Sequence, residues 1–253
     1  MFAGLSSLAA VASLALPRTC AVCRAADAAL CLGCRAQVDA SRWLDGPRRS
    51  RPDPEPGGLP PVLTSGRFEG ALAALVTAYK DDGRRDVAPV LSALLAEVVD
   101  AAVRQDPHVR RALAAGDGPV LVVPVPSSAA SRRRRGDAPL EALARAAVEG
   151  FGPHEAVVAE ALRMRRRVAD QAGLGAVGRH LNVEHSMAVR EPWHAPLDRA
   201  SCVVVDDVLT TGATLVEAAR ALRAAGAGPV VAAAICATQR RSRPPSRSPG
   251  SSR

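Results

Sequence analysis

Apolar positions follow two different periods along this chain. Between residues 68 and 103 they recur three and four residues apart, which predicts helices over 68–79 and 87–103. Short Val-rich runs at 120–126 and 201–208 instead predict buried strands. The other predicted elements are a helix over 139–149, a strand within 156–162, a helix over 215–225 followed by Gly226 as its C-cap, and a strand over 230–236. The alternation of strands and helices indicates an α/β fold, a parallel sheet flanked by helices.

Three segments fall outside this pattern. Residues 1–16 carry apolar side chains at helical spacing, so we expect a short helix there. They lack the basic start of a signal peptide, so we expect a cytoplasmic protein. Residues 45–61 are dense in Pro, Gly and charge, which is typical of a linker, and 239–253 hold only polar, Pro and Gly residues rich in Arg and Ser. The predicted domains are therefore 1–44, a linker over 45–61, a main domain over 62–238, and a disordered basic tail over 239–253.

Composition narrows the function classes. Of 253 residues, 48% are hydrophobic, which excludes a wholly disordered chain. No apolar run reaches the roughly 18 residues that a membrane span needs. The net charge of +8 points to an anionic partner, but 239–253 hold five arginines and no acid, leaving 28 basic against 25 acidic residues elsewhere. Lys80 is the only lysine in the chain.

Four of the six cysteines form two closely spaced CxxC pairs: Cys20, Cys23, Cys31 and Cys34. Four thiolates at this spacing can converge tetrahedrally on zinc, and they leave no open coordination position, so we expect a structural zinc. Disulfides are the alternative, and the missing signal peptide argues against them. Cys202 and Cys236 each stand alone in an apolar run and are expected in the core.

The strongest chemical signal lies between Val203 and Thr214. An apolar strand delivers Asp206 and Asp207 to its carboxyl end, where ligands of open α/β sheets bind. The Thr-rich turn that follows opens onto a helix N-terminus, which favours a phosphate group. Adjacent carboxylates suit ribose hydroxyls or a magnesium ion that holds them. The pattern therefore predicts a site for a ribose 5-phosphate.

This string resembles the phosphoribosyl pyrophosphate (PRPP) motif of type I phosphoribosyltransferases, which has four apolar residues, two acids and a Thr/Gly-rich turn. The wider chain resembles the ComF/GntX branch of that class. The features shared with that branch are the N-terminal helix, the four-cysteine module, Lys80 with Gly83, the Val123–Pro126 strand end, the Arg132–Gly136 loop, and Arg163, Arg165, Gln171, Arg179 and Asn182. Two departures stand out: Gly136-Asp137-Ala138-Pro139 replaces the usual Gly-Phe-Asn-Gln, and Val168 replaces a threonine.

The resemblance implies a function and a set of site residues. It implies Mg-dependent transfer of ribose 5-phosphate from PRPP to an unidentified acceptor. The implied PRPP-binding residues are Pro126, Ser127, Ser128, Asp206, Asp207, Thr210, Thr211, Gly212, Ala213 and Thr214. The implied catalytic residues are Asp206, Asp207, Lys80, Arg132 and Arg135. Cations are expected to close over the departing pyrophosphate, and Arg163 and the run 165–167 are further candidates for that role.

Two other functions fit the same residues. The chain can be a non-catalytic PRPP-site protein that binds single-stranded DNA during competence and DNA uptake, as the family name implies. Such grooves combine cations with stacking aromatics, and this chain has only six aromatic residues. It can also be a PRPP or nucleotide sensor without turnover. Tyr79 is expected in the core and Trp43 against the cysteine module, and the five histidines are expected on the surface.

Overall fold

The computed structural model describes residues 18–127, 137–165 and 185–239. Its helices are α2 (Leu32–Ala40), α3 (Gly70–Lys80), α4 (Ala88–Gln105), α5 (Pro107–Ala115), α7 (Pro139–Val148), α9 (His194–Leu197) and α10 (Ala213–Ala224), with 3-10 turns at Arg85–Val87 and Glu191–Trp193. Its strands are β1 (Arg48–Arg49), β2 (Val62–Arg67), β3 (Val120–Pro124), β4 (Ala156–Val158), β5 (Leu162–Met164), β6 (Met187–Val189), β7 (Cys202–Leu209) and β8 (Val230–Ala237).

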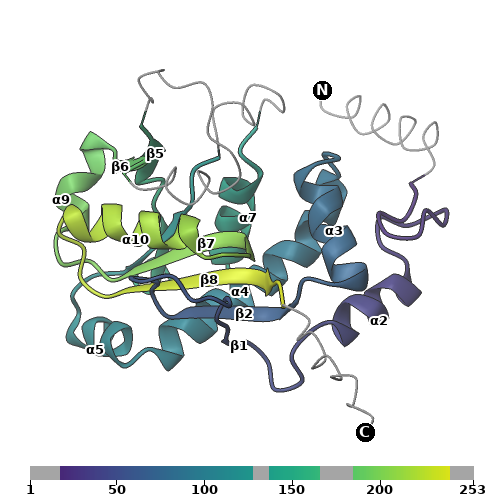
Figure 1. The fold of residues 1–253 in the computed structure, drawn as a ribbon, viewed down its shortest axis with the longest axis horizontal. Helices are drawn as coiled ribbons and strands as arrows, with labels where there is room; N and C mark the ends of the chain where they lie inside the picture. The colour runs from purple at the N-terminus through teal and green to yellow at the C-terminus, as the bar shows by residue number, and fades with distance from the viewer. Residues whose placement is uncertain (1–17, 128–136, 166–184, 240–253) are drawn as a thin grey trace, which may run out of the picture.

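Six of these strands form one sheet in the order β1-β2-β8-β7-β3-β4. Every pairing in it is parallel except that of β1 with β2. The carboxyl ends of the central strands β7 and β8 therefore lie at the same edge, and in Figure 1 their arrowheads point toward α3. The predicted fold class, a parallel sheet flanked by helices, is confirmed.

Each face of the sheet is covered by its own apolar core. Val203 and Val205 of β7 pack into a core shared with α3, α4 and α7. Val204, on the opposite face, packs into a second core with α9, α10 and the β5–β6 pair. Period-2 alternation along a strand buried on both sides produces this division, and it explains why the strand reads as a continuous Val run. The expected burial of Cys202 and Cys236 is confirmed, since both have no exposed surface.

Most predicted elements agree with the structure to within two residues, and the strand within 156–162 is the exception. It divides into β4, which joins the main sheet beside β3, and β5, which pairs antiparallel with β6 in a separate two-stranded sheet. The intervening residues turn the chain out of the main sheet, which a single apolar run could not reveal. Strand β2 and helices α2 and α5 were not predicted from the apolar pattern.

The segment expected as a linker, 45–61, packs against the main body. Within it β1 pairs with β2, and Leu59 and Pro56 lie beside the turn that precedes α10. Trp43 was expected to pack on the cysteine module, but its indole Nε1 donates to Thr64 of β2 at 3.0 Å. This part of the chain adds an edge to the sheet. The domain boundaries at 44, 61 and 238 stay predictions.

Within the described ranges, none of the helices combines the length and the apolar character that a membrane crossing requires.

Candidate functional site

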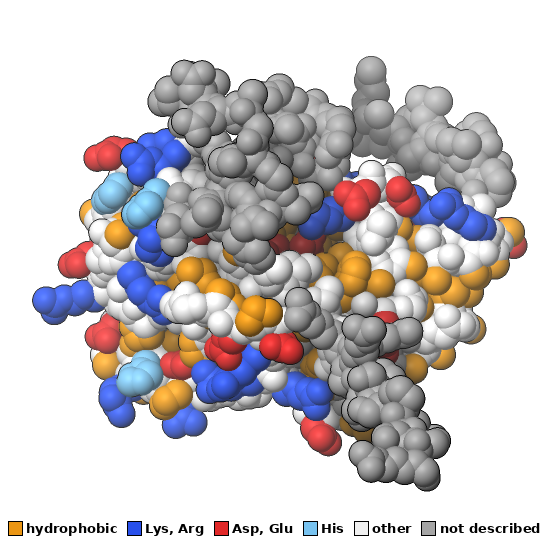
Figure 2. All heavy atoms as spheres, viewed as in Figure 1, with side chains coloured by type: hydrophobic (Ala, Val, Ile, Leu, Met, Phe, Trp, Pro, Cys, Tyr) orange, Lys and Arg blue, Asp and Glu red, His pale blue; other side chains and the backbone are white. Residues whose placement is uncertain are grey.

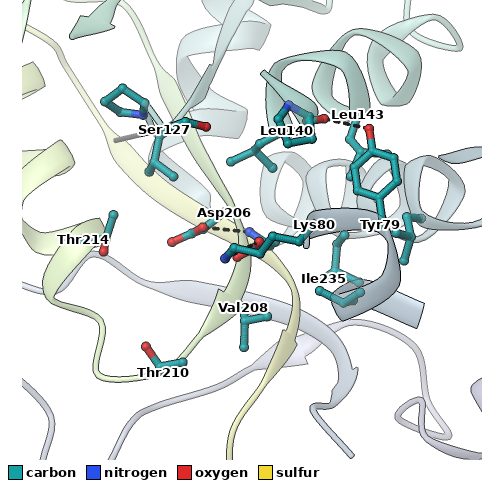
Figure 3. A pocket seen from close by; sticks show the side chains of 16 residues that line it. Tyr79, Lys80, Ser127, Leu140, Leu143, Asp206, Val208, Thr210, Thr214 and Ile235 are labelled. Atoms are coloured by element: carbon teal, nitrogen blue, oxygen red, sulfur yellow. Dashed lines mark hydrogen bonds and ion pairs between the residues drawn. The ribbon is translucent and has the colours of Figure 1, made fainter. Parts of the chain in front are cut away.

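A pocket of about 350 Å³ opens at the carboxyl ends of β3 and β7 (Figure 3). Its polar lining comprises Lys80, Ser127, Asp206, Asp207, Thr210 and Thr214. Its apolar lining comprises Val76, Tyr79, Leu91, Val125, Pro126, Pro139, Leu140, Leu143, Val208 and Ile235. These six polar residues, all predicted from the sequence, therefore meet in one cavity.

Two adjacent carboxylates and the only lysine of the chain form the centre of this pocket. Asp206 and Asp207 lie near the end of β7, and Lys80 is the last residue of α3. The Lys80 ammonium Nζ lies 2.6 Å from Asp207 Oδ2. The backbone N–H of Asp207 donates to Asp206 Oδ1 at 2.8 Å. Each carboxylate thus has a different partner, although the two residues are neighbours in sequence.

Asp207 contributes to the pKa shifts of both of its neighbours in the pocket, Asp206 and Lys80. Burial, and after it the charge of Asp207, raise the pKa of Asp206 to about 8, so this carboxyl holds a proton at neutral pH. Burial, the largest single cause, favours a neutral Lys80 amine. The charge and hydrogen bond of Asp207, with the nearby Asp206 and Asp81, together outweigh it and raise the pKa of Lys80. The pocket therefore holds less negative charge than two free carboxylates, and a bound cation would return the proton of Asp206 to solvent.

The turn between β7 and α10 borders the pocket as well. It carries Thr210, Thr211 and Gly212, and α10 begins at Ala213. The first N–H groups of a helix have no partner within it, and here the N–H of Ala213 makes a long contact, of 3.4 Å, with Thr211 Oγ1. An anion can replace that contact, and the helix dipole adds to the attraction. The hydroxyls of Thr210 and Thr214 border the same space (Figure 3).

Gly212 is required by both its conformation and its neighbours. Its φ is +78°, and a Cβ there would lie 2.8 Å from Leu59 Cδ1 and 3.4 Å from Pro56 Cγ. The segment 45–61 therefore lies directly against the turn between β7 and α10. Leu59 and Pro56 were missed by the sequence analysis, because nothing in a Pro-rich segment indicates which turn it packs against.

The loop that leaves β3 contributes Pro126 and Ser127 to the pocket. Val125 continues the strand pairing, since its N–H donates to the carbonyl of Val205 at 3.0 Å. This pairing brings the β3 loop beside Asp206 and Asp207. Three further predicted residues of this loop, Ser128, Arg132 and Arg135, lie outside the residues that the structure describes.

Tyr79 is buried, as expected, but it also lines the pocket. Its hydroxyl donates to the carbonyl of Pro139 at 2.9 Å, which joins the end of α3 to the start of α7. The Arg85 guanidinium contacts Asp137 at 2.6 Å and lies over the Tyr79 ring at 4.6 Å from its centroid. These contacts hold α3, and with it Lys80, against the opposite wall.

Two arginines expected over the pyrophosphate lie elsewhere. Arg163 and Arg165 belong to the β5 region and line a groove beside the C-terminal half of α10, not the pocket that holds Asp206. The reason is the departure of β5 from the main sheet. Residues 166 and 167, Gln171, Arg179 and Asn182 lie outside the described ranges.

The four cysteines Cys20, Cys23, Cys31 and Cys34 meet at one point, with all four sulfurs within 4.8 Å of one another. Zinc with Zn–S bonds of about 2.3 Å holds four sulfurs about 3.8 Å apart in a tetrahedron. The Sγ atoms of Cys23 and Cys31 lie 3.6 Å apart, close to that spacing and far from a disulfide bond. The donor set therefore fits a tetrahedral zinc.

The cysteines differ in their surroundings. Burial acts against the Cys20 thiolate, but hydrogen bonds from the backbone near Cys23 and Cys31 outweigh it and lower the pKa of Cys20 to about 6. Burial, with the neighbouring sulfurs, raises the pKa of Cys34 to about 12. A cation would favour the thiolate form of all four, because metal binding requires deprotonated sulfur.

Arg84 connects the cysteine module to the turn that follows α3. Its guanidinium donates to the carbonyl of Thr19 at 2.6 Å and to the carboxylate of Asp86 at 2.8 Å. Thr19 precedes Cys20, and Arg84 lies four residues after Lys80. The module is therefore fixed to the same turn that holds the lysine of the pocket.

Comparison with known proteins agrees with this site. The phosphoribosyl transferase domain family matches residues 184–250, a stretch that includes Asp206 to Thr214. Among solved structures, the allosteric regulatory enzyme of purine biosynthesis aligns with 59% of this chain and 26% of its own, at 18% identity and a TM-score of 0.35. That overlap is too limited to carry an argument about activity. Comparison with curated proteins gave no match.

The chain is therefore phosphoribosyltransferase-like over residues 184–250, which supports a PRPP-binding site in the pocket. The family match covers β6 to β8, including Asp206 and Asp207 of β7 and the turn that follows them. The motif found in the sequence lies in this same part of the chain.

Proposed function

We propose that this protein is a Mg-dependent phosphoribosyltransferase of the ComF type, which transfers ribose 5-phosphate from PRPP to an acceptor. The observation that carries the proposal is the meeting of Asp206, Asp207 and Lys80 with a Thr-rich helix N-terminus in one cavity. A sugar diol and a phosphate at opposite ends of one ligand match this distribution of donors and acceptors.

The 5-phosphate binds at the turn 210–214. The N–H groups of Ala213 and Thr214 and the hydroxyls of Thr210 and Thr211 donate to its oxygens. Gly212 lets the backbone of the turn take its left-handed conformation. The partial positive charge of the helix end, roughly half an elementary charge, favours the phosphate at this turn.

The ribose hydroxyls bind at Asp206 and Asp207. Both side chains offer oxygen acceptors, and oxygen donors are the ligands that Mg²⁺ prefers. The raised pKa of Asp206 fits a site that becomes fully ionised only beside a cation. When bound with PRPP, magnesium would neutralise charge on the pyrophosphate as it leaves.

Lys80 stabilises the departing group. In the reaction the bond from the anomeric carbon to pyrophosphate breaks, the carbon forms a bond to the acceptor, and the acceptor loses a proton. The Lys80 ammonium, now paired with Asp207, lies where negative charge accumulates, beside the loop that carries Pro126 and Ser127. The arginines 132 and 135 would add to it from the same loop.

The four-cysteine module has a structural role in this proposal. Zinc is held by Cys20, Cys23, Cys31 and Cys34. Arg84, which donates to the carbonyl of Thr19, connects the module to the turn after Lys80. The zinc takes no part in the transfer, because four cysteine ligands leave no open position.

The test is pyrophosphate release from PRPP and Mg²⁺ across a panel of nucleobases and amines. We expect release with at least one acceptor, and its loss in Lys80→Gln. Measurable PRPP affinity without release from any acceptor would contradict the transferase and leave the non-catalytic PRPP-site protein in its place. In that case, single-stranded DNA binding would be measured on the same preparation, with its salt dependence.

A further inference from the structure

A second groove, of about 550 Å³, lies between the β5–β6 pair and the C-terminal half of α10. Its charged and polar lining consists of Arg163, Arg165, Arg190, Glu191, His194 and Arg220. Its apolar lining consists of Met187, Ala188, Val189, Ala221, Ala224 and Ala225. Figure 2 shows basic and histidine side chains gathered over the end of the molecule that carries α9 and this strand pair.

The strand pair presents its arginines on one face. Arg163 is in register with Ala188, so Arg165 and Arg190, each two residues along, share that face. The opposite face is apolar: Leu162, Met187 and Val189 belong to the core beneath. The apolar side of the β5–β6 pair therefore packs on the core, and its arginines lie on the opposite, outer face.

The arginines of the groove differ in how their charge is balanced. Arg220 is paired with the buried carboxylate of Glu217 at 2.7 Å. The same carboxylate accepts a hydrogen bond from the backbone N–H of Met187. Within the described ranges, the side chain of Arg190 donates only to a backbone carbonyl, that of Leu162, at 3.1 Å. Arg163 and Arg165 are exposed and have no ion-pair or hydrogen-bond partner for their side chains in the part of the chain that the structure describes.

The groove is separate from the Asp206 pocket. The turn 210–212 of the pocket precedes the first residue of α10, whereas the groove borders Arg220 to Ala225 at the other end of the helix. At 1.5 Å per residue, the ends of this helix are on the order of 16 Å apart. The C-terminal carbonyls of α10 repel anions, so the positive potential of the groove comes entirely from its side chains.

We propose that this groove is a second anion site, for a compact ligand with two or more linked phosphates, the chemistry of a nucleoside polyphosphate. Arg163 and Arg165 are roughly 6.6 Å apart along the strand, so each guanidinium can bind a different phosphate through two N–H donors. The small side chains of the alanines in the lining leave room for an apolar body, and the volume suits a small molecule. A single-stranded nucleic acid fits less well, because the described residues that line the groove include no aromatic side chain for bases to stack on.

The experiment is calorimetric titration of the full chain with inorganic tripolyphosphate, without divalent cations. Arg163→Gln with Arg165→Gln should weaken binding at least tenfold. Asp206→Asn with Asp207→Asn should leave it within twofold, which separates this site from the proposed PRPP site. The matched control is Arg110→Gln with Arg111→Gln, two exposed arginines of α5.

Three outcomes would overturn the proposal. The first is unchanged affinity in the Arg163/Arg165 variant, with its thermal unfolding also unchanged. The second is an equal loss in the α5 control, which would mean general charge attraction. The third is an affinity for single-stranded oligonucleotides that rises with their length, exceeds that for tripolyphosphate and depends on Arg163 and Arg165, which would make the groove part of a nucleic-acid track.

Discussion

The ammonium of Lys80 lies 2.6 Å from the carboxylate of Asp207, although 126 residues separate them in the sequence. The contact joins the end of α3 to the end of β7 at the centre of the pocket. Because Lys80 is the only lysine, its amine can be followed chemically with no other side-chain amine in the way.

The reactivity of this amine is the first prediction. Asp207 raises the pKa of Lys80, so in the free protein Lys80 should acetylate more slowly than the N-terminal amine, the internal reference. Asp207→Asn should speed its acetylation several-fold, because the neutral amine is the reactive form. PRPP with Mg²⁺ should protect Lys80 in the wild-type protein. Peptide mass spectrometry measures all three, and equal labelling with and without PRPP would refute the placing of Lys80 beside the ligand.

A second prediction concerns pH and Asp206. Its pKa is raised to about 8 from 3.8, so the folded state holds a proton that the unfolded state releases. The free energy of unfolding should therefore fall as pH rises from about 4 to about 8. Asp206→Asn should remove this slope, since an amide does not titrate and its oxygen can still accept from the Asp207 N–H.

The measurement is urea unfolding at several pH values. The control is Asp45→Asn, which alters an exposed carboxylate and should leave the slope unchanged. Parallel profiles of the wild type and Asp206→Asn would show that Asp206 is ionised throughout.

The sequence predicted the strand, the acids and the Thr turn because they are local: one apolar run ends in two carboxylates and a glycine. It also predicted Lys80 as a site residue, through a resemblance rather than through any pattern that indicates the contact with Asp207. It could not predict that Leu59 packs against Gly212, because this contact joins segments about 150 residues apart. It misplaced Arg163 and Arg165, because the period of an apolar run does not reveal where the chain leaves a sheet.

The contact between Leu59 and Gly212 yields a third prediction. Gly212→Ala should destabilise the fold by about 2 kcal/mol, from the left-handed φ and the clash with Leu59, and should weaken PRPP binding at the turn. In a Leu59→Ala background, the steric part should disappear and the φ part should remain. A double-mutant cycle should therefore give a coupling of about 1 kcal/mol. Additive effects would show that the two residues do not touch.

A fourth prediction concerns the cysteine module. The purified protein should contain one zinc per chain, and Cys20→Ser with Cys34→Ser should abolish it. Loss of the metal should lower the midpoint of thermal unfolding, because the free energy of metal binding contributes to folding. Through Arg84 it should also weaken PRPP protection of Lys80. Metal analysis and thermal unfolding test the first two, and a full zinc content in the double variant would rule out these ligands.

The proposed function depends on PRPP binding in the pocket between Asp206 and Thr214. Calorimetric titration of PRPP with Mg²⁺ into the wild type and into Asp206→Asn with Asp207→Asn tests it directly, with Asp45→Asn as the matched control. We expect a single site in the wild type and in the control, and at least a hundredfold weaker binding in the double variant, with an intact fold. PRPP binding that is undiminished in the double variant would contradict it.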